Sequence, residues 1–113
     1  TRNIFRQSAR AFSGDEMALA ISLRCVDRGY LDVVGEPSCR FMLMPMMHSE
    51  DLKIQKAALP LFKKYTSDLT HDFAVKHHDV IIQFERFPHR NMVMGRPNTA
   101  EENIYLTQPG SSF

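Results

Sequence analysis

Basic side chains gather in a short stretch near the carboxyl end of the sequence. Arg86, His89, Arg90 and Arg96 fall within 11 residues, and Asn91 lies among them. Arginine carries forked N–H donors that suit phosphate and carboxylate groups, so one interpretation is a pocket for an anionic small molecule. The other is structural: Arg86, His89 and Arg90 pair with the free carbonyls and the negative dipole end of the preceding helix, and Asn91 and Gly95 allow unusual turn dihedrals. We favour the structural interpretation and keep the anion pocket as its rival.

A second set of candidate residues contains His77, His48 and Glu50. His77 lies on the same helical stripe as Val80 and Ile81, so we expect it to be buried. A lone histidine on an apolar face is usually bonded to a backbone carbonyl or a hydroxyl. The alternative is that His77 meets His48 and Glu50 across a pair of helices, which requires a shared polar cavity.

Motifs for metal binding and covalent catalysis are missing from the sequence. It contains no His-Glu-x-x-His, no Cys-His finger spacing, no Gly-x-Ser-x-Gly elbow, no phosphate loop and no dinucleotide fingerprint. The methionines at positions 42, 44, 46 and 47 have the spacing of a soft copper(I) site, but methionine is also a common filler of irregular cores, which we favour. We therefore expect no metal ion and no cofactor.

Composition narrows the class of protein. The chain has 113 residues, of which 43% are hydrophobic, enough for one core. Its formal net charge of +1 gives no strong field that attracts nucleic acid or an anionic membrane. The longest apolar run, residues 41–47, is far shorter than the roughly 20 residues that cross a bilayer, and no signal-peptide pattern opens the chain. We expect a cytoplasmic protein, without nucleic acid or membrane partners, in which Cys25 and Cys39 are buried thiols.

Apolar residues recur at intervals of three and four, which is the spacing of helices rather than strands. The pattern predicts helices over residues 15–28, 37–44, 49–65, 67–87 and 99–106. Short turns join them, so the predicted architecture is all-α, with antiparallel helical hairpins in a bundle or a stacked array. We expect residues 1–113 to form a single helical domain.

Individual residues are expected to set the helix ends. Pro45 should end or kink the second helix, and Ser49 should cap the third. Thr99 and Glu102 have the spacing of a capping box at the start of the last helix.

Two further patterns concern the fourth helix and an internal repeat. Leu69 and Phe73 are expected on the buried stripe of the fourth helix. Residues 1–5 echo residues 89–93, and an arginine soon follows each, which indicates two equivalent corners.

The order of these residues along the chain resembles a known family. The matching residues are Arg2, Asn3, Arg6, Ala11, Phe12, Asp15, Ala18, Leu19, Pro45, the run 48–52, His77, the run 87–91, Gly95, Arg96, Thr99, Glu102, Gly110 and Phe113. Together they resemble domain-of-unknown-function family 924 (DUF924), mostly bacterial, with a tetratricopeptide-like (TPR-like) helical fold. The resemblance implies this fold and no established activity. Family members usually carry another helical segment upstream, so we expect the chain to lack that segment.

Two classes of function follow from these observations. The first is a TPR-like protein-binding module without catalysis, engaging a protein partner or a second copy of itself. The alternative is an enzyme or small-ligand binder with a pocket for an anionic small molecule. The candidate site residues are His77, Arg90, Asn91, Arg96, His48, Glu50 and His89. The alternative requires these side chains to converge on one partly buried pocket.

Overall fold

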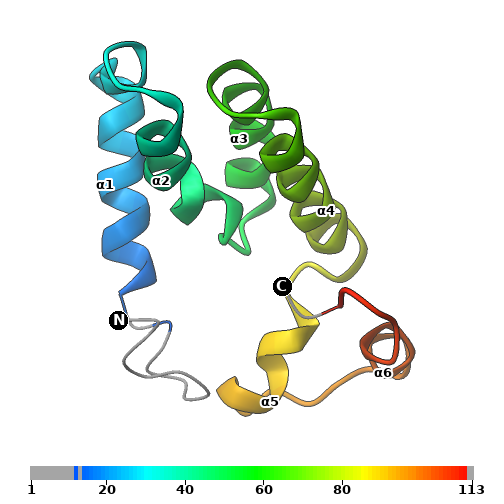
Figure 1. Ribbon diagram of the computed structural model, residues 1–113. Coiled ribbons are helices and arrows are strands. Elements are labelled where there is room, and N and C mark those ends of the chain that lie inside the picture. The colour runs from blue at the N-terminus through cyan, green and yellow to red at the C-terminus, as the bar shows by residue number, and fades with distance from the viewer. Residues whose placement is uncertain (1–11, 13, 112–113) are drawn as a thin grey trace.

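The computed structural model describes Phe12 and residues 14–111, and every regular element among these residues is a helix (Figure 1). The longer helices are α1 (Asp15–Asp27), α2 (Glu36–Met47), α3 (Leu52–Tyr65), α4 (Asp68–Phe84) and α6 (Ala100–Leu106). The shorter ones are the 3₁₀ turns η2 (Tyr30–Asp32) and η3 (Pro88–Arg90) and the single turn α5 (Asn91–Met94). The predicted all-α fold is confirmed.

Neighbouring helices pack in chain order, α1 on α2, α2 on α3 and α3 on α4. In Figure 1 the pairs α1–α2 and α3–α4 run antiparallel as two hairpins, and α5 and α6 lie below them. The molecule measures 44 × 27 × 22 Å, so the array is elongated. The segment from η3 to α6 therefore forms a corner at one end of the array.

Two apolar clusters hold these parts together. The larger one lies between α2, α3 and α4 and includes Leu43, Met46, Phe62 and Ala74. Met46 and Met47 are both buried, which confirms the interpretation of the methionine run as core filler. The smaller cluster contains Val80, Ile81 and Phe87, with Leu52, Phe84 and Tyr105 packed against it. It joins α4 to the corner.

The structure corrects two predicted helix ends. Helix α2 continues through Pro45 to Met47, because the burial of Met46 and Met47 outweighs the one backbone hydrogen bond that proline removes. Helix α3 begins at Leu52, and its N-cap is Asp51, whose carboxylate accepts from the Lys53 amide at 2.9 Å. The Ser49 hydroxyl instead accepts from the Asp51 amide in the turn before the helix, so its predicted role as the cap is wrong.

Helix α4 ends three residues earlier than predicted, and its buried face also differs from the prediction. Leu69 and Phe73 are 68% and 46% exposed. The face that packs inward carries smaller side chains, including Thr70 and Ala74, which allow a close approach to α3. Leu69 and Phe73 were therefore assigned to the buried stripe wrongly, whereas Val80 and Ile81 on the same predicted stripe are buried.

The remaining local predictions have mixed outcomes. The capping box is confirmed, since the Thr99 hydroxyl accepts from the Glu102 amide at 3.1 Å and the Glu102 carboxylate accepts from the Thr99 amide at 2.9 Å. Cys39 is buried as expected, whereas Cys25 is half-buried, and both are free thiols. The repeat at residues 1–5 lies outside the described residues.

Candidate functional site

The corner meets the helical array through an ion pair between Arg96 and Glu50. Arg96 donates from Nη1 to Glu50 Oε1 at 3.0 Å and from Nη2 to Oε2 at 3.2 Å. The Phe87 amide also donates to Glu50 Oε2, at 2.6 Å. Burial raises the pKa of Glu50, but the hydrogen bonds from Arg96 and Phe87 and the nearby arginine charges outweigh it and lower the pKa overall. Glu50 is therefore ionised, and its carboxylate binds the corner through Arg96 and Phe87.

Asn91 and the Phe87 carbonyl fix Arg96 in this position. Arg96 Nε donates to Asn91 Oδ1 at 2.9 Å, and Arg96 Nη2 donates to the Phe87 carbonyl at 3.2 Å. The Asn91 side-chain amide in turn donates from Nδ2 to Asn98 Oδ1 at 2.9 Å. Asn91 is fully buried, and its hydrogen bond orients the guanidinium of Arg96.

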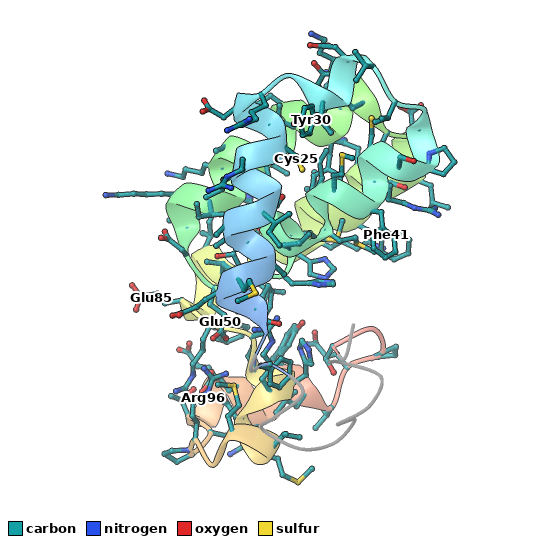
Figure 2. All side chains as sticks on the ribbon, turned by 90° about the vertical axis from the view of Figure 1, so that its left-hand side faces the viewer. Cys25, Tyr30, Phe41, Glu50, Glu85 and Arg96 are labelled. Atoms are coloured by element: carbon teal, nitrogen blue, oxygen red, sulfur yellow. The ribbon has the colours of Figure 1, made fainter. Side chains whose placement is uncertain are left out.

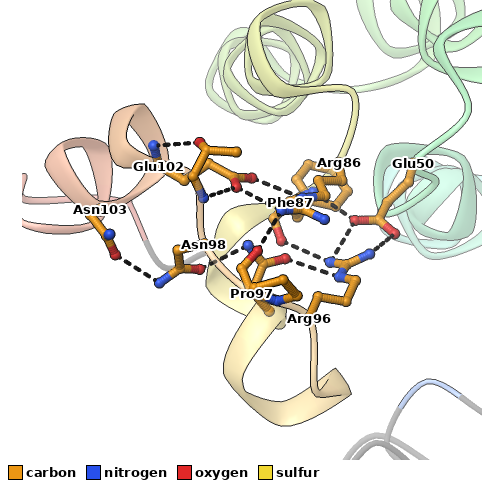
Figure 3. Close-up of polar contacts among 10 residues, drawn as sticks. Glu50, Arg86, Phe87, Arg96, Pro97, Asn98, Glu102 and Asn103 are labelled. Atoms are coloured by element: carbon orange, nitrogen blue, oxygen red, sulfur yellow. Dashed lines mark hydrogen bonds and ion pairs between the residues drawn. The ribbon is translucent and has the colours of Figure 1, made fainter.

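A second arginine–glutamate pair lies beside the first (Figure 3). Arg86 donates from Nε to Glu102 Oε2 at 2.9 Å and from Nη2 to Oε1 at 2.7 Å. The bond from Arg86, helped by the Thr99 amide, lowers the pKa of the buried Glu102 carboxyl to about 2. Arg86 was predicted to pair with carbonyls of α4, but its guanidinium binds Glu102 of α6 and the Pro97 carbonyl instead.

Arg90 is the most deeply buried cation of the stretch, with only 6% of its side chain exposed. Its Nη2 donates to the His48 carbonyl at 2.7 Å, and its Nη1 lies 3.9 Å from Asp15 Oδ2. The guanidinium lies 4.6 Å from the ring centre of Phe12 and 4.8 Å from that of Phe87. Arg90 was predicted to cap α4, but His48 is the C-cap of α2, so Arg90 ties the corner to α1 and α2.

His77 lies on the inner face of α4, as predicted. Its Nδ1 donates to the Phe73 carbonyl at 2.6 Å, and only 5% of the residue is exposed. Burial, together with the charge of Arg90, lowers the pKa of His77 and outweighs the backbone hydrogen bond, so the ring is neutral at pH 7. The His77 ring is 5.8 Å from that of His48, the neighbour anticipated by the sequence, and 5.7 Å from that of Phe87.

A cleft of about 520 Å³ opens between α1, α2 and the corner. Its apolar wall includes Phe12, Leu19, Phe41, Met44, Pro45 and Met94. Its polar side chains are Asp15, Glu16, His48, Ser49, Glu50 and Arg90. In Figure 2 Phe41 lies on the α2 side of the molecule, and Glu50 and Arg96 lie below it, toward the corner. Apolar and acidic side chains therefore share one opening.

The predicted site residues converge only in part. His48, Glu50 and Arg90 line the cleft. The other four support these three or their neighbours: His77 contacts His48, Arg96 and Asn91 hold Glu50 in place, and the His89 ring lies 5.8 Å from that of Phe87.

Sequence reasoning missed the cleft residues that come from α1 and α2. In the sequence Asp15 stood out only as a residue that matches the family, and Phe41 only as part of an apolar run. No spacing signal could have found them, because 75 residues separate Asp15 from Arg90.

The described residues offer neither a metal cluster nor a membrane-spanning helix. Within Phe12 and residues 14–111, no group of three His, Cys, Asp or Glu side chains is placed to hold a metal ion. None of the described helices combines the length and the apolar character that crossing a membrane requires.

The fold and the site define a class: an all-helical array of antiparallel hairpins whose corner is fixed by arginine–carboxylate pairs. The chain belongs to the family described as bacterial protein of unknown function DUF924, whose model matches residues 1–110. Its fold is similar to that of the protein of unknown function ATU0120 from Agrobacterium tumefaciens, with a TM-score of 0.85 and 33% sequence identity. The similarity covers 90% of this chain and 57% of that one, so this chain spans little more than half of that protein. Among curated proteins none is significantly similar to the chain.

Proposed function

We propose that this chain is a protein-binding module without catalysis of its own, and that the cleft between α1, α2 and the corner receives an apolar part of a protein partner. The observation that carries the proposal is the exposure of Phe41. This residue is 84% exposed and lines the apolar wall of the cleft. An aromatic side chain exposed beside a concave apolar surface is typical of an interaction site.

The internal pairing of the arginines favours protein binding over an anion pocket. Arg96 and Arg86 each direct two donors at a glutamate, and Arg90 donates to a backbone carbonyl. An incoming phosphate or carboxylate would have to displace these partners and leave a partly buried glutamate without its cation, at a cost of several kcal/mol. The same pairs instead give the cleft a rigid frame, which lowers the entropic cost of binding.

A pull-down that compares two phenylalanine variants tests this proposal. Phe41→Ala removes the exposed aromatic side chain at the cleft, and Phe73→Ala removes one that is also exposed but lies on α4, outside the cleft. A partner recovered by the wild type and by Phe73→Ala should be lost from Phe41→Ala. Equal recovery by all three proteins, or recovery of nothing above background, contradicts the proposal. Sedimentation velocity identifies a second copy of the chain as the partner if Phe41→Ala abolishes a dimer.

A second candidate function is an enzyme or small-ligand binder that takes an anionic small molecule, and one observation favours it. His48 lines the cleft and contacts the buried His77, and the cleft volume of about 520 Å³ falls within the roughly 300–1,000 Å³ of small-molecule sites. A ligand that binds only the folded state raises the melting temperature. If phosphate or citrate raises it for the wild type and not for His48→Ala, the second candidate replaces the first.

A further inference from the structure

We propose that Met44 and Met94 form a modification site in the cleft, where oxidation to methionine sulfoxide weakens the binding of an apolar ligand. The inference rests on the proposed function and adds to it a means of regulation. It follows from the placement of these two methionines on the cleft wall and from their access to solvent.

The methionines of the chain differ in how far an oxidant can reach them. Met46 and Met47 are 1% and 3% exposed and belong to the larger apolar cluster. Met94 is 40% exposed, Met44 is half-buried, and both line the cleft. Met44 comes from α2 and Met94 from the end of α5, so the two thioethers reach the cleft from different walls. Because Met44 also packs against the larger cluster, Met94 should react first.

Hydrogen peroxide is the oxidant that the modification requires. The thioether sulfur attacks one oxygen of the peroxide, so an S–O bond forms and the O–O bond breaks. The second oxygen leaves as hydroxide and takes the proton from the new sulfur-bound hydroxyl, which gives the sulfoxide and one molecule of water. Sulfur loses two electrons and the peroxide gains them. A methionine sulfoxide reductase reverses the change with electrons from a dithiol.

The sulfoxide should affect binding much more than folding. In the free protein the cleft is open, so water can hydrate the new oxygen. An apolar ligand would remove that water, and the neighbouring side chains of Leu19, Phe41 and Pro45 have no donor to replace it. A buried polar group without a hydrogen bond is costly, so the oxidised cleft should bind such a ligand about tenfold more weakly.

A peptide probe tests this inference in the whole chain. Dodecapeptides without methionine or cysteine are selected from a random phage-displayed library on the reduced wild type, and those that also bind Phe41→Ala are removed. A selected peptide should bind about tenfold more weakly after the protein has been treated with peroxide, and reductase with dithiothreitol should restore the affinity. Mass spectrometry locates the oxidised methionines, and the circular dichroism of the helices should stay unchanged.

The possible failures of this experiment separate the inference from the proposed function. Unchanged affinity of a protein oxidised at Met94, or a loss of its helical signal, would overturn the inference and leave the proposed function standing. A failure to select any peptide that depends on Phe41 would overturn both.

Met92 provides the matched control, because it is 90% exposed on the same short helix but does not line the cleft. Leucine has nearly the volume of methionine and no sulfur, so the double variant Met44→Leu/Met94→Leu should bind the peptide equally well before and after peroxide. Met94→Leu alone should be partly protected, and Met92→Leu should lose affinity as the wild type does. Cys25 is present in all three variants, so oxidation of its thiol cannot explain a difference between them. Equal losses in Met94→Leu and Met92→Leu would overturn the inference.

Discussion

Arg96 and Glu50 are 46 residues apart in the chain and face each other through two hydrogen bonds of 3.0 and 3.2 Å. The side chains are 23% and 24% exposed, so water screens the pair only in part. This pair connects the segment after α5 to the turn before α3. It therefore holds the corner, one of the surfaces that border the cleft.

A double-mutant cycle on this pair should show strong coupling. Glu50→Gln leaves the Arg96 guanidinium without its carboxylate in a partly buried position, and we expect it to lower the free energy of unfolding by about 2 kcal/mol. Arg96→Met should have a similar effect, because Glu50 then lacks its cation. Since each single change already breaks the pair, the double variant should be at least about 1 kcal/mol more stable than the sum of the two losses predicts. Urea denaturation measures all four proteins, and additive losses would contradict the coupling.

Acid should unfold the protein partly through Glu102. The pKa of this carboxyl falls from its ordinary value of 4.5 to about 2 in the folded chain, so the folded state binds the proton more weakly than the unfolded state. Its contribution to stability is therefore complete above about pH 4.5 and is lost as the pH falls toward 2. Glu102→Gln should be less stable at pH 7 and should show a shallower decline over this window. Urea denaturation at a series of pH values measures the decline, and an unchanged slope would contradict the prediction.

His77 should cause a further loss of stability on acidification, and this loss should begin at a higher pH than the loss from Glu102. Its pKa is lowered from 6.5 in the folded chain, so stability begins to fall when the pH drops below about 6.5, where the unfolded chain takes up the proton first. His77→Leu should remove this part of the pH dependence. An NMR titration of the His77 ring checks the cause directly, and a midpoint at or above 6.5 would show that burial does not control the ring.

The sequence predicts those features whose determinants lie within a few residues of one another. Thr99 and Glu102 are three residues apart on one turn, so their capping box follows from spacing alone. The burial of His77 follows from its helical stripe together with Val80 and Ile81.

The failures arise where a contact depends on how helices pack. Leu69 and Phe73 are apolar and correctly spaced, but α4 turns a face with smaller side chains toward its neighbours. Likewise, neither the pairing of Arg96 with Glu50 nor the approach of Arg90 to Asp15 has a local signal, because each joins segments that only the tertiary fold brings together. The candidate cations were thus recognisable from the sequence, but the carboxylates and the carbonyl that bind them were not.

A substitution of Glu85, at the end of α4, should raise the stability of the protein. This residue is the C-cap of α4 and has φ +62°, the left-handed conformation that glycine adopts most easily (its position is labelled in Figure 2). Glu85→Gly should raise the free energy of unfolding by about 0.5–1 kcal/mol, because it relieves the strain of a side chain at positive φ. Glu85→Ala keeps the Cβ atom and is the matched control, so it should give no such gain. The side chain of Glu85 is exposed, and no charge pair is lost from the described contacts in either variant. Thermal unfolding at pH 7 measures the stability of both variants. A Glu85→Gly protein no more stable than Glu85→Ala would show that the backbone at the end of α4 is not strained.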